Sequence, residues 1–538
     1  MAPHFCLAAI IIPSLFLALS SASTSQLPPS AVNACKVSSD PPTYESELAT
    51  SGLKTSSDPT AVQIIHAAMK VSSDKLGTAK SKVEDIRKSS AGNHNMTVAA
   101  DTCLELYGYV EHRAKSAGVA LDGGEIKDAR AWMSAAFAYQ YDCWSALKYV
   151  NESSQVNDTM AYTWAHLLFT GDVLGMLANY DQKGGDTTLW GPTKTERNGF
   201  WEKTEYESGP AIVGGVPSGL TASVTVCKTN KQCNYQKVQD AVDAAPTWGR
   251  QKFVILIKAG LYEEIVRVPF NKTNVVFVGE GMGKTIITGD LNVGIQLKTT
   301  YHTPTVGVNG DGFMAKNLTI KNTAGIGAHQ AVALRLDSDH SIIESCEFIG
   351  NQDTLYAHSL RQYYKDCHIQ GNVDFIFGNS AAVFQDCTIS VAPRQQHPEK
   401  ADKATVTAHA KLIAAQTTGF VFLNSIINGT EDFMQFYAKQ PEQFEGSCFL
   451  GRPWKEYSRT VFIDCTLGDL ISREGWEIWD ANSTLSNLYY GEVGSKNAAG
   501  KTVDTTKRVP WSSQIDSKNV PSFYPQNFIQ ASKWFSNS

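Results

Sequence analysis

The chain has 538 residues, of which 42% are hydrophobic and 19% are charged, so it is long enough to form more than one domain with a hydrophobic core. This composition excludes intrinsic disorder and a small disulfide-held scaffold. The 53 acidic residues exceed the 47 basic ones and no dense run of Lys and Arg occurs, which argues against a nucleic-acid partner. The 11 cysteines include no C-x-x-C pair, and no H-E-x-x-H run is present, so we expect no metal ion.

The first segment, residues 1–23, predicts a signal peptide. Residues 5–19 are almost wholly apolar, and the small residues at 20–23 are typical of a cleavage site. About 15 apolar residues are fewer than the roughly 20 that a membrane-spanning helix needs, although an uncleaved anchor is the alternative. We therefore expect a secreted protein without a membrane segment in its mature form. Sequons compatible with glycosylation lie at Asn95, Asn151, Asn157, Asn271, Asn428 and Asn482.

Residues 24–183 predict an all-α domain, a four-helix bundle. An alanine-rich stretch at 131–139 lacks proline and shows no strand-like alternation. Four apolar residues fall on one stripe of a helix with 3.6 residues per turn: Met160, Trp164, Leu167 and Leu168. Residues 184–219 then concentrate glycine, proline, threonine and charge, which is typical of a linker.

From residue 220 to 538 the sequence consists of short β-rich runs separated by Gly, Asn and Asp. One pattern recurs as IIESCEFIGN, YYKDCHIQGN, VFQDCTIS, VFLNSIING and VFIDCTLG. Its small residues are Cys346, Cys367, Cys387, Ser425 and Cys465, at steps of 21, 20, 38 and 40. Steps of one or two times a period near 20 predict a parallel β-solenoid whose coils bury a common core; a β-sandwich with accidental similarity is the alternative.

The repeat places two aspartates at equivalent positions, because Asp353 and Asp374 each follow the small residue of their repeat by seven residues. Equivalent positions on adjacent coils lie about 4.8 Å apart. One pKa of such a pair should rise, so that one carboxylate can be a nucleophile and the other a general acid. An exposed ladder of turn aspartates is the alternative. Because no G-x-S-x-G elbow, P-loop or dinucleotide-binding motif is present, this pair is the strongest candidate for catalysis.

At these residues the chain resembles the plant pectin methylesterases, specifically the form that carries an amino-terminal inhibitor-like pro-region. The matching segments are GLYEE at 260–264, QAVALR at 330–335, GNQDTLY at 350–356, DFIFG at 374–378 and LGRPW at 450–454. The resemblance implies a right-handed parallel β-helix over residues 220–538. It also implies hydrolysis of galacturonate methyl esters in pectin (homogalacturonan), without a cofactor, with release of methanol and modification of the plant cell wall.

The resemblance assigns roles to four residues around the ester. Asp374 would be the nucleophile that attacks the C6 carbonyl. Asp353 would be the acid that protonates the leaving methanol and then the base that activates water. Gln352 and Gln330 resemble the residues that donate hydrogen bonds to the oxyanion, an interaction typically worth about 2.7–4 kcal/mol in a transition state.

Three further residues would position the nucleophile or bind substrate. Arg452 would hold Asp374 ionised and contact substrate, Trp454 offers a flat face for a sugar ring, and Thr300 matches a substrate-contacting threonine in a looser motif. Taken singly, an arginine before proline is more often a surface ion pair, a tryptophan is more often a core residue, and a glutamine in a coil turn more often bonds to the backbone. The segment TAHAK at 407–411 departs from the family pattern, so we expect the groove contacts there to differ.

Two disulfides are expected in the second half. Cys367 and Cys387 share one register on adjacent coils, and one strand spacing lies within the range of about 4.4–6.8 Å between Cα atoms that a disulfide needs. Some relatives have this bridge, but a reduced, buried cysteine stack is the competing interpretation. Cys227 and Cys233 resemble a local loop disulfide.

The helical region resembles the inhibitor domain through DTCLELY at 101–107. Cys103 and Cys143 match the interhelical disulfide of that domain, whereas Cys35 has no evident partner. The basic residues of the linker are isolated, so no dibasic cleavage site is predicted. A tethered bundle has a high effective concentration near its own groove, so we expect it to contact the catalytic domain and to inhibit it, guide its folding, or both.

Two other functions remain open at this stage. Stacked carboxylates near 5 Å also suit a retaining glycosidase, and a lyase can share the fold. The chain could instead be an inactive pectin-binding or inhibitor protein. Methanol release without new reducing ends would distinguish an esterase from both.

Overall fold

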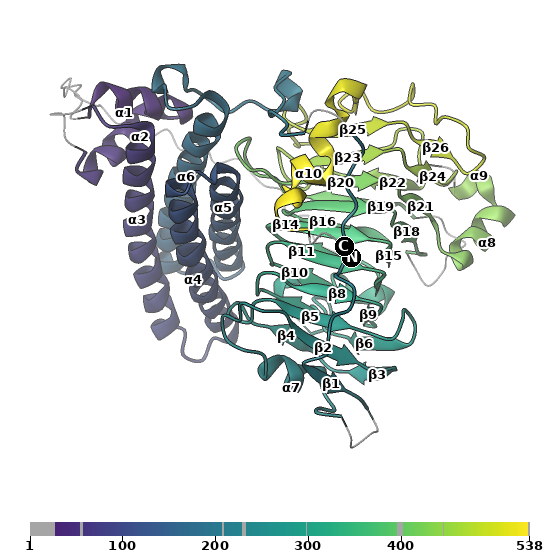
Figure 1. The fold of residues 1–538 in the computed structure, drawn as a ribbon. Coiled ribbons are helices and arrows are strands. Elements are labelled where there is room, and N and C mark those ends of the chain that lie inside the picture. The colour runs from purple at the N-terminus through teal and green to yellow at the C-terminus, as the bar shows by residue number, and fades with distance from the viewer. Residues whose placement is uncertain are drawn as a thin grey trace.

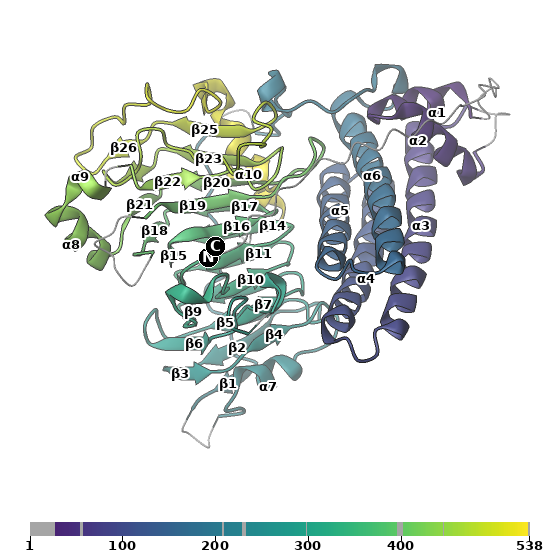
Figure 2. The ribbon, with the colours of Figure 1, turned by 180° about the vertical axis from the view of Figure 1, so that it is seen from behind.

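The computed structural model describes residues 27–53, 58–206, 209–228, 233–296, 298–394, 402–444 and 446–535. A helical bundle stands beside a long parallel β-helix, with α4 and α5 facing the β-helix and α3 on the outside (Figures 1 and 2). The predicted fold, an all-α bundle followed by a right-handed parallel β-helix, is confirmed. The predicted signal peptide lies outside the described residues.

Four long helices form the bundle: α3 (Ala61–Ser89), α4 (His94–Asp122), α5 (Ile126–Lys148) and α6 (Ser154–Lys183). Helices α3, α4 and α6 each begin with an N-cap residue. The side chains of Thr60, Asn93 and Ser153 each accept a hydrogen bond from a backbone N–H in the first turn. The expected disulfide between Cys103 and Cys143 joins α4 to α5, with 4.5 Å between the Cα atoms. The bundle therefore has both local caps and a covalent link across helices.

The apolar stripe expected on α6 is not its buried face. Leu167 is buried, but Trp164 is 39% exposed and Leu168 is 53% exposed. The buried face includes polar residues instead: His166 and Thr170 both hydrogen-bond to the Ser72 hydroxyl, at 3.2 and 3.0 Å. Because paired polar groups can be buried at little cost, apolar periodicity alone indicated the wrong face.

Shorter helices flank these domains. The α-helices are α1 (Pro29–Ala34), α2 (Pro41–Leu48), α7 (Val238–Asp243), α8 (Glu431–Lys439), α9 (Pro441–Phe444) and α10 (Pro525–Phe528). The 3-10 helices are η1 (Cys35–Val37), η2 (Ala49–Ser51), η3 (Thr187–Leu189), η4 (Glu196–Asn198), η5 (Thr300–His302), η6 (Ile326–Ala328), η7 (Ser517–Phe523) and η8 (Ala531–Lys533).

Three parallel sheets build the β-helix in the described part of the chain. Sheet 1 has, in spatial order, β1 (Val224–Val226), β2 (Phe253–Ile257), β5 (Val275–Val278), β8 (Met314–Lys316), β11 (Ser341–Glu344), β14 (Arg361–Lys365), β17 (Ala381–Gln385), β20 (Gly419–Leu423), β23 (Arg459–Ile463), β25 (Tyr489–Val493) and β27 (Ser513–Gln514). Sheet 2 has β3 (Gly260–Glu263), β6 (Thr285–Gly289), β9 (Thr319–Asn322), β12 (Glu347–Ile349), β15 (His368–Gly371), β18 (Thr388–Val391), β21 (Ile426–Gly429), β24 (Thr466–Leu467) and β26 (Lys496–Asn497). Sheet 3 has β4 (Val266–Val268), β7 (Val306–Val308), β10 (Leu334–Leu336), β13 (Leu355–Ala357), β16 (Val373–Gly378), β19 (Ala404–His409) and β22 (Cys448–Gly451).

The repeats that predicted the solenoid lie at the turn between sheets 1 and 2. The backbone oxygens of Cys346 and Cys367 accept hydrogen bonds from the next coil at 2.9 and 2.8 Å, so the repeats stack in register. The residue before each small residue has a left-handed backbone, as at Asp366 and Asp386 with φ of 52° and 55°. Asp and Asn tolerate this conformation, which explains their recurrence in the pattern.

The disulfide expected between Cys367 and Cys387 is wrong, because both residues are buried free thiols. Each sulfur instead lies 3.4 Å from the backbone oxygen two residues earlier in its own repeat. Side chains at equivalent positions of an in-register ladder project in parallel, so their Cβ atoms are separated by the strand spacing of about 4.8 Å. A disulfide needs Cβ atoms about 3.5–4.5 Å apart. The competing interpretation, a reduced cysteine stack, describes the molecule.

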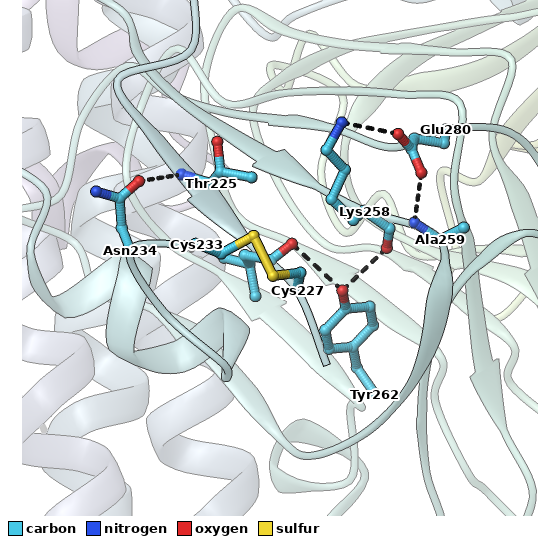
Figure 3. Close-up of a disulfide and its surroundings, with 9 residues drawn as sticks. Thr225, Cys227, Cys233, Asn234, Lys258, Ala259, Tyr262 and Glu280 are labelled. Carbon is cyan, nitrogen blue, oxygen red and sulfur yellow. Dashed lines mark hydrogen bonds and ion pairs between the residues drawn. A yellow bond between two sulfur atoms is a disulfide. The ribbon is translucent and has the colours of Figure 1, made fainter. Parts of the chain in front are cut away.

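Cys227 and Cys233 form the expected loop disulfide directly after β1 (Figure 3). Beside it, the Tyr262 hydroxyl donates to the backbone oxygen of Lys258 at 2.9 Å, and the Thr225 N–H donates to the Asn234 side chain at 2.8 Å. These contacts hold the first coil where the β-helix begins.

The segment 184–219 is attached to both domains. Glu196 forms an ion pair with Arg459 of β23 at 2.5 Å. Glu202 forms ion pairs with Arg130 and Lys127 of α5 at 2.7 and 3.1 Å. The glycine- and proline-rich composition therefore marks an anchored connection rather than a free tether.

The bundle docks on the turns that follow the strands of sheet 3. Arg113 of α4 makes a bidentate pair with Asp311 at 2.6 and 2.7 Å, and the Arg361 guanidinium bridges Asp128 of α5 and Asp339. Further contacts join Glu125 to Lys533, Trp132 to Asp339, Tyr139 to Ser359, Tyr141 to Lys455 and Asp142 to His358. The bundle therefore lies along one side of sheet 3.

Candidate active site

The two predicted aspartates lie on adjacent coils at the start of sheet 3. Leu355 of β13 pairs with Ile376 of β16, and the Asp353 N–H donates to the Val373 oxygen at 3.1 Å. Asp353 and Asp374 both have left-handed backbones, with φ of 64° and 49°. Asp374 also lies in a β-bulge, because the pairing of β16 with β19 shifts by one residue there. The turn and the bulge together re-aim both carboxyl groups away from the ordinary alternation of a strand.

Arg452, directly after β22, holds one of these carboxyl groups. Its Nε and Nη2 atoms donate to the two oxygens of Asp374 at 2.8 and 2.6 Å. Asp374 is 5% exposed and Asp353 is 7% exposed. In the described part of the chain no hydrogen bond involves the Asp353 carboxyl group. The pair is therefore asymmetric, with one paired and one unpaired carboxyl group.

Burial and the charge of Asp374 raise the pKa of Asp353 well above its usual range, against the smaller opposing effect of the Arg452 charge. Burial also raises the pKa of Asp374, but hydrogen bonds and charge from Arg452 act against that rise. The neutral form is therefore favoured more strongly at Asp353 than at Asp374.

Two other predicted residues lie on the coils of this region, Gln352 beside Asp353 and Gln330 on the preceding coil, whereas Thr300 lies further away, before β7. Gln330 and Gln352 are half-buried on neighbouring coils, where the Ala331 N–H donates to the Gln352 oxygen at 3.2 Å. No hydrogen bond within the described residues involves either side-chain amide, so both can donate to a ligand. Thr300 begins η5, and Thr303, the residue after η5, accepts through its hydroxyl a hydrogen bond from the N–H of Val332, two residues before β10, at 3.2 Å.

An apolar floor crosses the coils beside the aspartates. It consists of Val332, Tyr356, Phe377 and Ala408, with Trp454 and Trp479 packed against it. The rings of Tyr356 and Phe377 stack with centroids 4.1 Å apart, and Trp454 lies 6.1 Å from Phe377. A chain-like ligand lying along the β-helix axis would therefore meet one apolar side chain per coil.

Two site residues were missed by the sequence analysis. The Arg452 guanidinium lies 4.5 Å from the Trp479 ring centroid, so a cation–π contact holds its face while Asp374 holds its edge. Glu477 raises the pKa of Asp374 by its charge and pairs with Lys403 at 2.8 Å. The tryptophan pair in GWEIW at 475–479 was the available signal.

The TAHAK departure affects the interior rather than the groove. His409 is fully buried, and its Nδ1 accepts from the Arg459 N–H at 3.1 Å. Lys411 is also buried, and burial lowers its pKa to about 7. Only the small Ala408 of this segment joins the apolar floor.

Over the described ranges, no three His, Cys, Asp or Glu side chains are grouped so that they could hold a metal ion. None of the described helices combines the length and the apolar character needed to cross a membrane.

Comparison with known proteins identifies the family. Residues 223–532 match the family model described as Pectinesterase. The chain belongs to the pectinesterase family. Residues 30–170 match the model described as Plant invertase/pectin methylesterase inhibitor, so this pectinesterase carries an inhibitor-like N-terminal domain.

Several known pectinesterases are similar to the chain. It is 54% identical over 492 residues to "Probable pectinesterase/pectinesterase inhibitor 64" of Arabidopsis thaliana, covering 89% of this chain and 80% of that protein. It is 36% identical over 418 residues to "Pectinesterase 1" of Citrus sinensis, covering 76% of this chain and 69% of that protein. Among solved structures, "Pectin methylesterase from Carrot" is 40% identical with a TM-score of 0.55, covering 59% of this chain and 96% of that one.

Proposed function

We propose that this pectinesterase hydrolyses the methyl esters of galacturonate units in homogalacturonan, with Asp374 as nucleophile and Asp353 as acid and base. The observation that carries the proposal is the asymmetric carboxyl pair, in which Arg452 makes two hydrogen bonds to Asp374 and none to Asp353. An ionised carboxylate beside a neutral acid is the combination that acyl transfer to an alcohol leaving group requires.

In the first step, an oxygen of Asp374 attacks the ester carbonyl carbon. The developing oxyanion accepts hydrogen bonds from the Gln352 and Gln330 amides. As the tetrahedral intermediate collapses, the C–O bond to the methoxy group breaks and Asp353 transfers its proton to that oxygen. Methanol leaves, and the galacturonyl group is held as an anhydride with Asp374.

In the second step, Asp353 is a carboxylate and accepts a proton from water. The resulting hydroxide attacks the galacturonyl carbonyl and displaces the Asp374 carboxylate. The product is galacturonic acid, which releases its proton to solvent and leaves as galacturonate, and Asp353 is again protonated. Trp454 supports a sugar ring beside the reacting unit, and Thr300 contacts the chain from η5.

The test compares methanol with reducing ends after incubation with highly methylated homogalacturonan. We expect methanol without new reducing ends, and we expect Asp374→Ala to abolish its release while the folded far-UV spectrum is retained. New reducing ends would favour a glycosidase, and an unreactive wild-type protein would favour a binding role. An Asp374→Ala protein that keeps more than a few per cent of the activity would remove the nucleophile assignment.

The bundle borders the groove in this proposal. In the described part of the chain, no hydrogen bond or ion pair joins the bundle to Asp353, Asp374 or Arg452. His358, which pairs with Asp142 of the bundle, is five residues beyond Asp353, or roughly 16 Å of extended strand. This position supports partial restriction of access more than complete inhibition in cis. Comparing the full chain with one that starts near Gly215, both shown to be folded, measures the restriction.

Secretion to the cell wall is also part of the proposal, on the basis of residues 1–23. Protein recovered from the medium of expressing plant cells should begin near Ser23 or Thr24. A mature protein that retains residues 5–19 would contradict it.

A further inference from the structure

A row of aromatic rings leaves the groove and continues across the domain boundary onto the bundle. It begins at Trp479, which stacks on Arg452, and Trp454 lies 6.4 Å from Trp479. Lys455 comes next, with its Nζ atom 5.2 Å from the Trp454 ring and 4.6 Å from the Tyr141 ring of α5. The row therefore connects the catalytic arginine to the helical domain.

On the bundle, the row runs from α5 to α6. The Tyr141 ring lies 5.7 Å from Trp144, and Trp144 lies 4.9 Å from Trp164. Figures 1 and 2 both show α5 close to the β-helix and α6 next to it. The rings thus form two groups, Trp479 with Trp454 on the β-helix and Tyr141 with Trp144 and Trp164 on the bundle, and Lys455 joins them.

The bundle core does not account for these rings. Trp164 is 39% exposed and lies off the buried face of α6, and its neighbour Leu168 is 53% exposed. Tyr141 and Trp144 are only partly buried. Exposed aromatic and apolar side chains that form a continuous patch usually mark a binding surface.

Lysines alternate with the rings. Besides Lys455, Lys148 places its Nζ atom 5.6 Å from the Trp144 ring. The acidic group nearest the boundary, Asp142, is compensated because its carboxylate pairs with His358 at 3.0 Å. Asp337 and Asp142 outweigh the effect of burial and raise the pKa of that histidine to about 9. The row is therefore apolar and carries lysine side chains, and burial lowers the pKa of Lys455 to about 8.

A small cleft lies where the row crosses between the domains. Tyr141 and Asp142 of α5 line it on one side, and Tyr356, Trp454 and Lys455 line it on the other. Because Tyr356 belongs to the apolar floor of the groove, the cleft continues that groove onto the bundle.

We propose that this row, Trp454, Lys455, Tyr141, Trp144, Lys148 and Trp164, is a binding surface for a de-esterified stretch of homogalacturonan. Sugar rings present flat C–H faces that pack on aromatic rings, and each hydrolysed unit carries a carboxylate that a lysine can pair with. The inference rests on the proposed function, because it identifies the occupant as the polymer whose esters the site cleaves. The inhibitor-like domain is then part of the substrate-binding surface.

The experiment measures binding of the full chain by calorimetry to de-esterified galacturonan, either as trimers or as chains long enough to reach from Arg452 to Trp164. The test variant is Trp144→Ala/Trp164→Ala. The matched control is Tyr206→Ala, which removes an aromatic side chain that is 45% exposed at a site held by Asn527. We expect the double variant to raise Kd for long chains by about tenfold, with trimers unaffected, because buried aromatic contacts dominate binding energy.

Charge is tested separately with Lys148→Met. This variant should weaken binding of de-esterified long chains and leave binding of fully esterified long chains unchanged. Conservative Trp164→Tyr should restore most of the binding that Trp164→Ala loses, which separates a contact role from a folding defect.

The outcomes are distinct. Unchanged affinity of the double variant for long chains, in a background where the wild type binds them, would overturn the inference. So would concentration-dependent dimerisation of the wild type that the double variant abolishes, because the row would then bind a second copy of the chain. Failure of the proposed function would be seen instead as a wild type that releases no methanol from short methylated oligomers, a reaction that does not depend on Trp144, Lys148 or Trp164 of the bundle.

Discussion

Replacing Arg452 tests whether this arginine lowers the pKa of Asp374 relative to that of Asp353. Arg452 holds Asp374 through hydrogen bonds of 2.8 and 2.6 Å. Opposite charges about 4 Å apart interact by about 4 kcal/mol at an effective dielectric constant of about 20, which corresponds to about 3 pKa units. Arginine beside aspartate lowers the pKa by about 1–3 units in proteins. We therefore expect Arg452→Gln to raise the pKa of Asp374 by about 1–3 units, and Arg452→Lys by less, because lysine keeps the charge but loses the bidentate geometry.

The assay is kcat/KM for methanol release as a function of pH, which reports the free enzyme. Asp374 must be ionised to attack, so the rate falls as the pH drops through its pKa, and a raised pKa moves the acid limb to higher pH. The acid limb of the profile should lie at the lowest pH in the wild type, at a higher pH in Arg452→Lys and at the highest pH in Arg452→Gln. The control Lys403→Gln removes a cation that pairs with Glu477 at 2.8 Å and should move the limb less. A glutamine variant that loses rate but keeps the wild-type acid limb would refute the reasoning.

Three further changes test other parts of the site and fold. Asp353→Asn should lower kcat by about 10²–10⁴-fold because an amide cannot supply the proton, and an unaltered rate would exclude the acid role. Trp479→Ala should lower kcat/KM by about 5–30-fold, since a cation–π contact of about 1–2 kcal/mol positions Arg452, while Trp479→Phe should lose less; equal rates in both variants would contradict this. Unfolding without reductant in iodoacetamide should alkylate Cys367 and Cys387, which mass spectrometry would detect, whereas a peptide linked through these two residues would contradict the thiol stack.

The sequence repeat predicted most of the fold of the second domain. A small residue at steps of one or two times a period near 20 predicted both the coil and its register, and the residue before it, which is Ser, Asp or Asn, has a left-handed backbone at that turn. The same register brought Asp353 and Asp374 onto adjacent coils. The face of α6 was not predictable from periodicity, because hydrogen-bonded His166 and Thr170 lie inside while Trp164 lies outside.

Contacts between segments far apart in the sequence were harder to predict than the repeat. Arg452 is 78 residues from Asp374, and only the family resemblance connected them. Trp479 reaches Arg452 because Gly451 pairs with Trp476, a pairing made outside the repeating pattern. The docking of the bundle depends on single charges such as Arg113 and Arg361, which form no sequence motif.

The site illustrates how a repetitive fold produces an asymmetric pair. A parallel in-register ladder places like residues in like surroundings, so two stacked aspartates would compete for one proton on nearly equal terms. The difference has to come from outside the repeat. Here it comes from Arg452, which follows β22 and approaches from the later coils, so that its guanidinium reaches Asp374 and not Asp353. Trp479 covers the face of that guanidinium, and this limits its other orientations. The β-helix places the two acids on adjacent coils, and two residues from non-equivalent positions, Arg452 and Trp479, make the surroundings of Asp374 differ from those of Asp353.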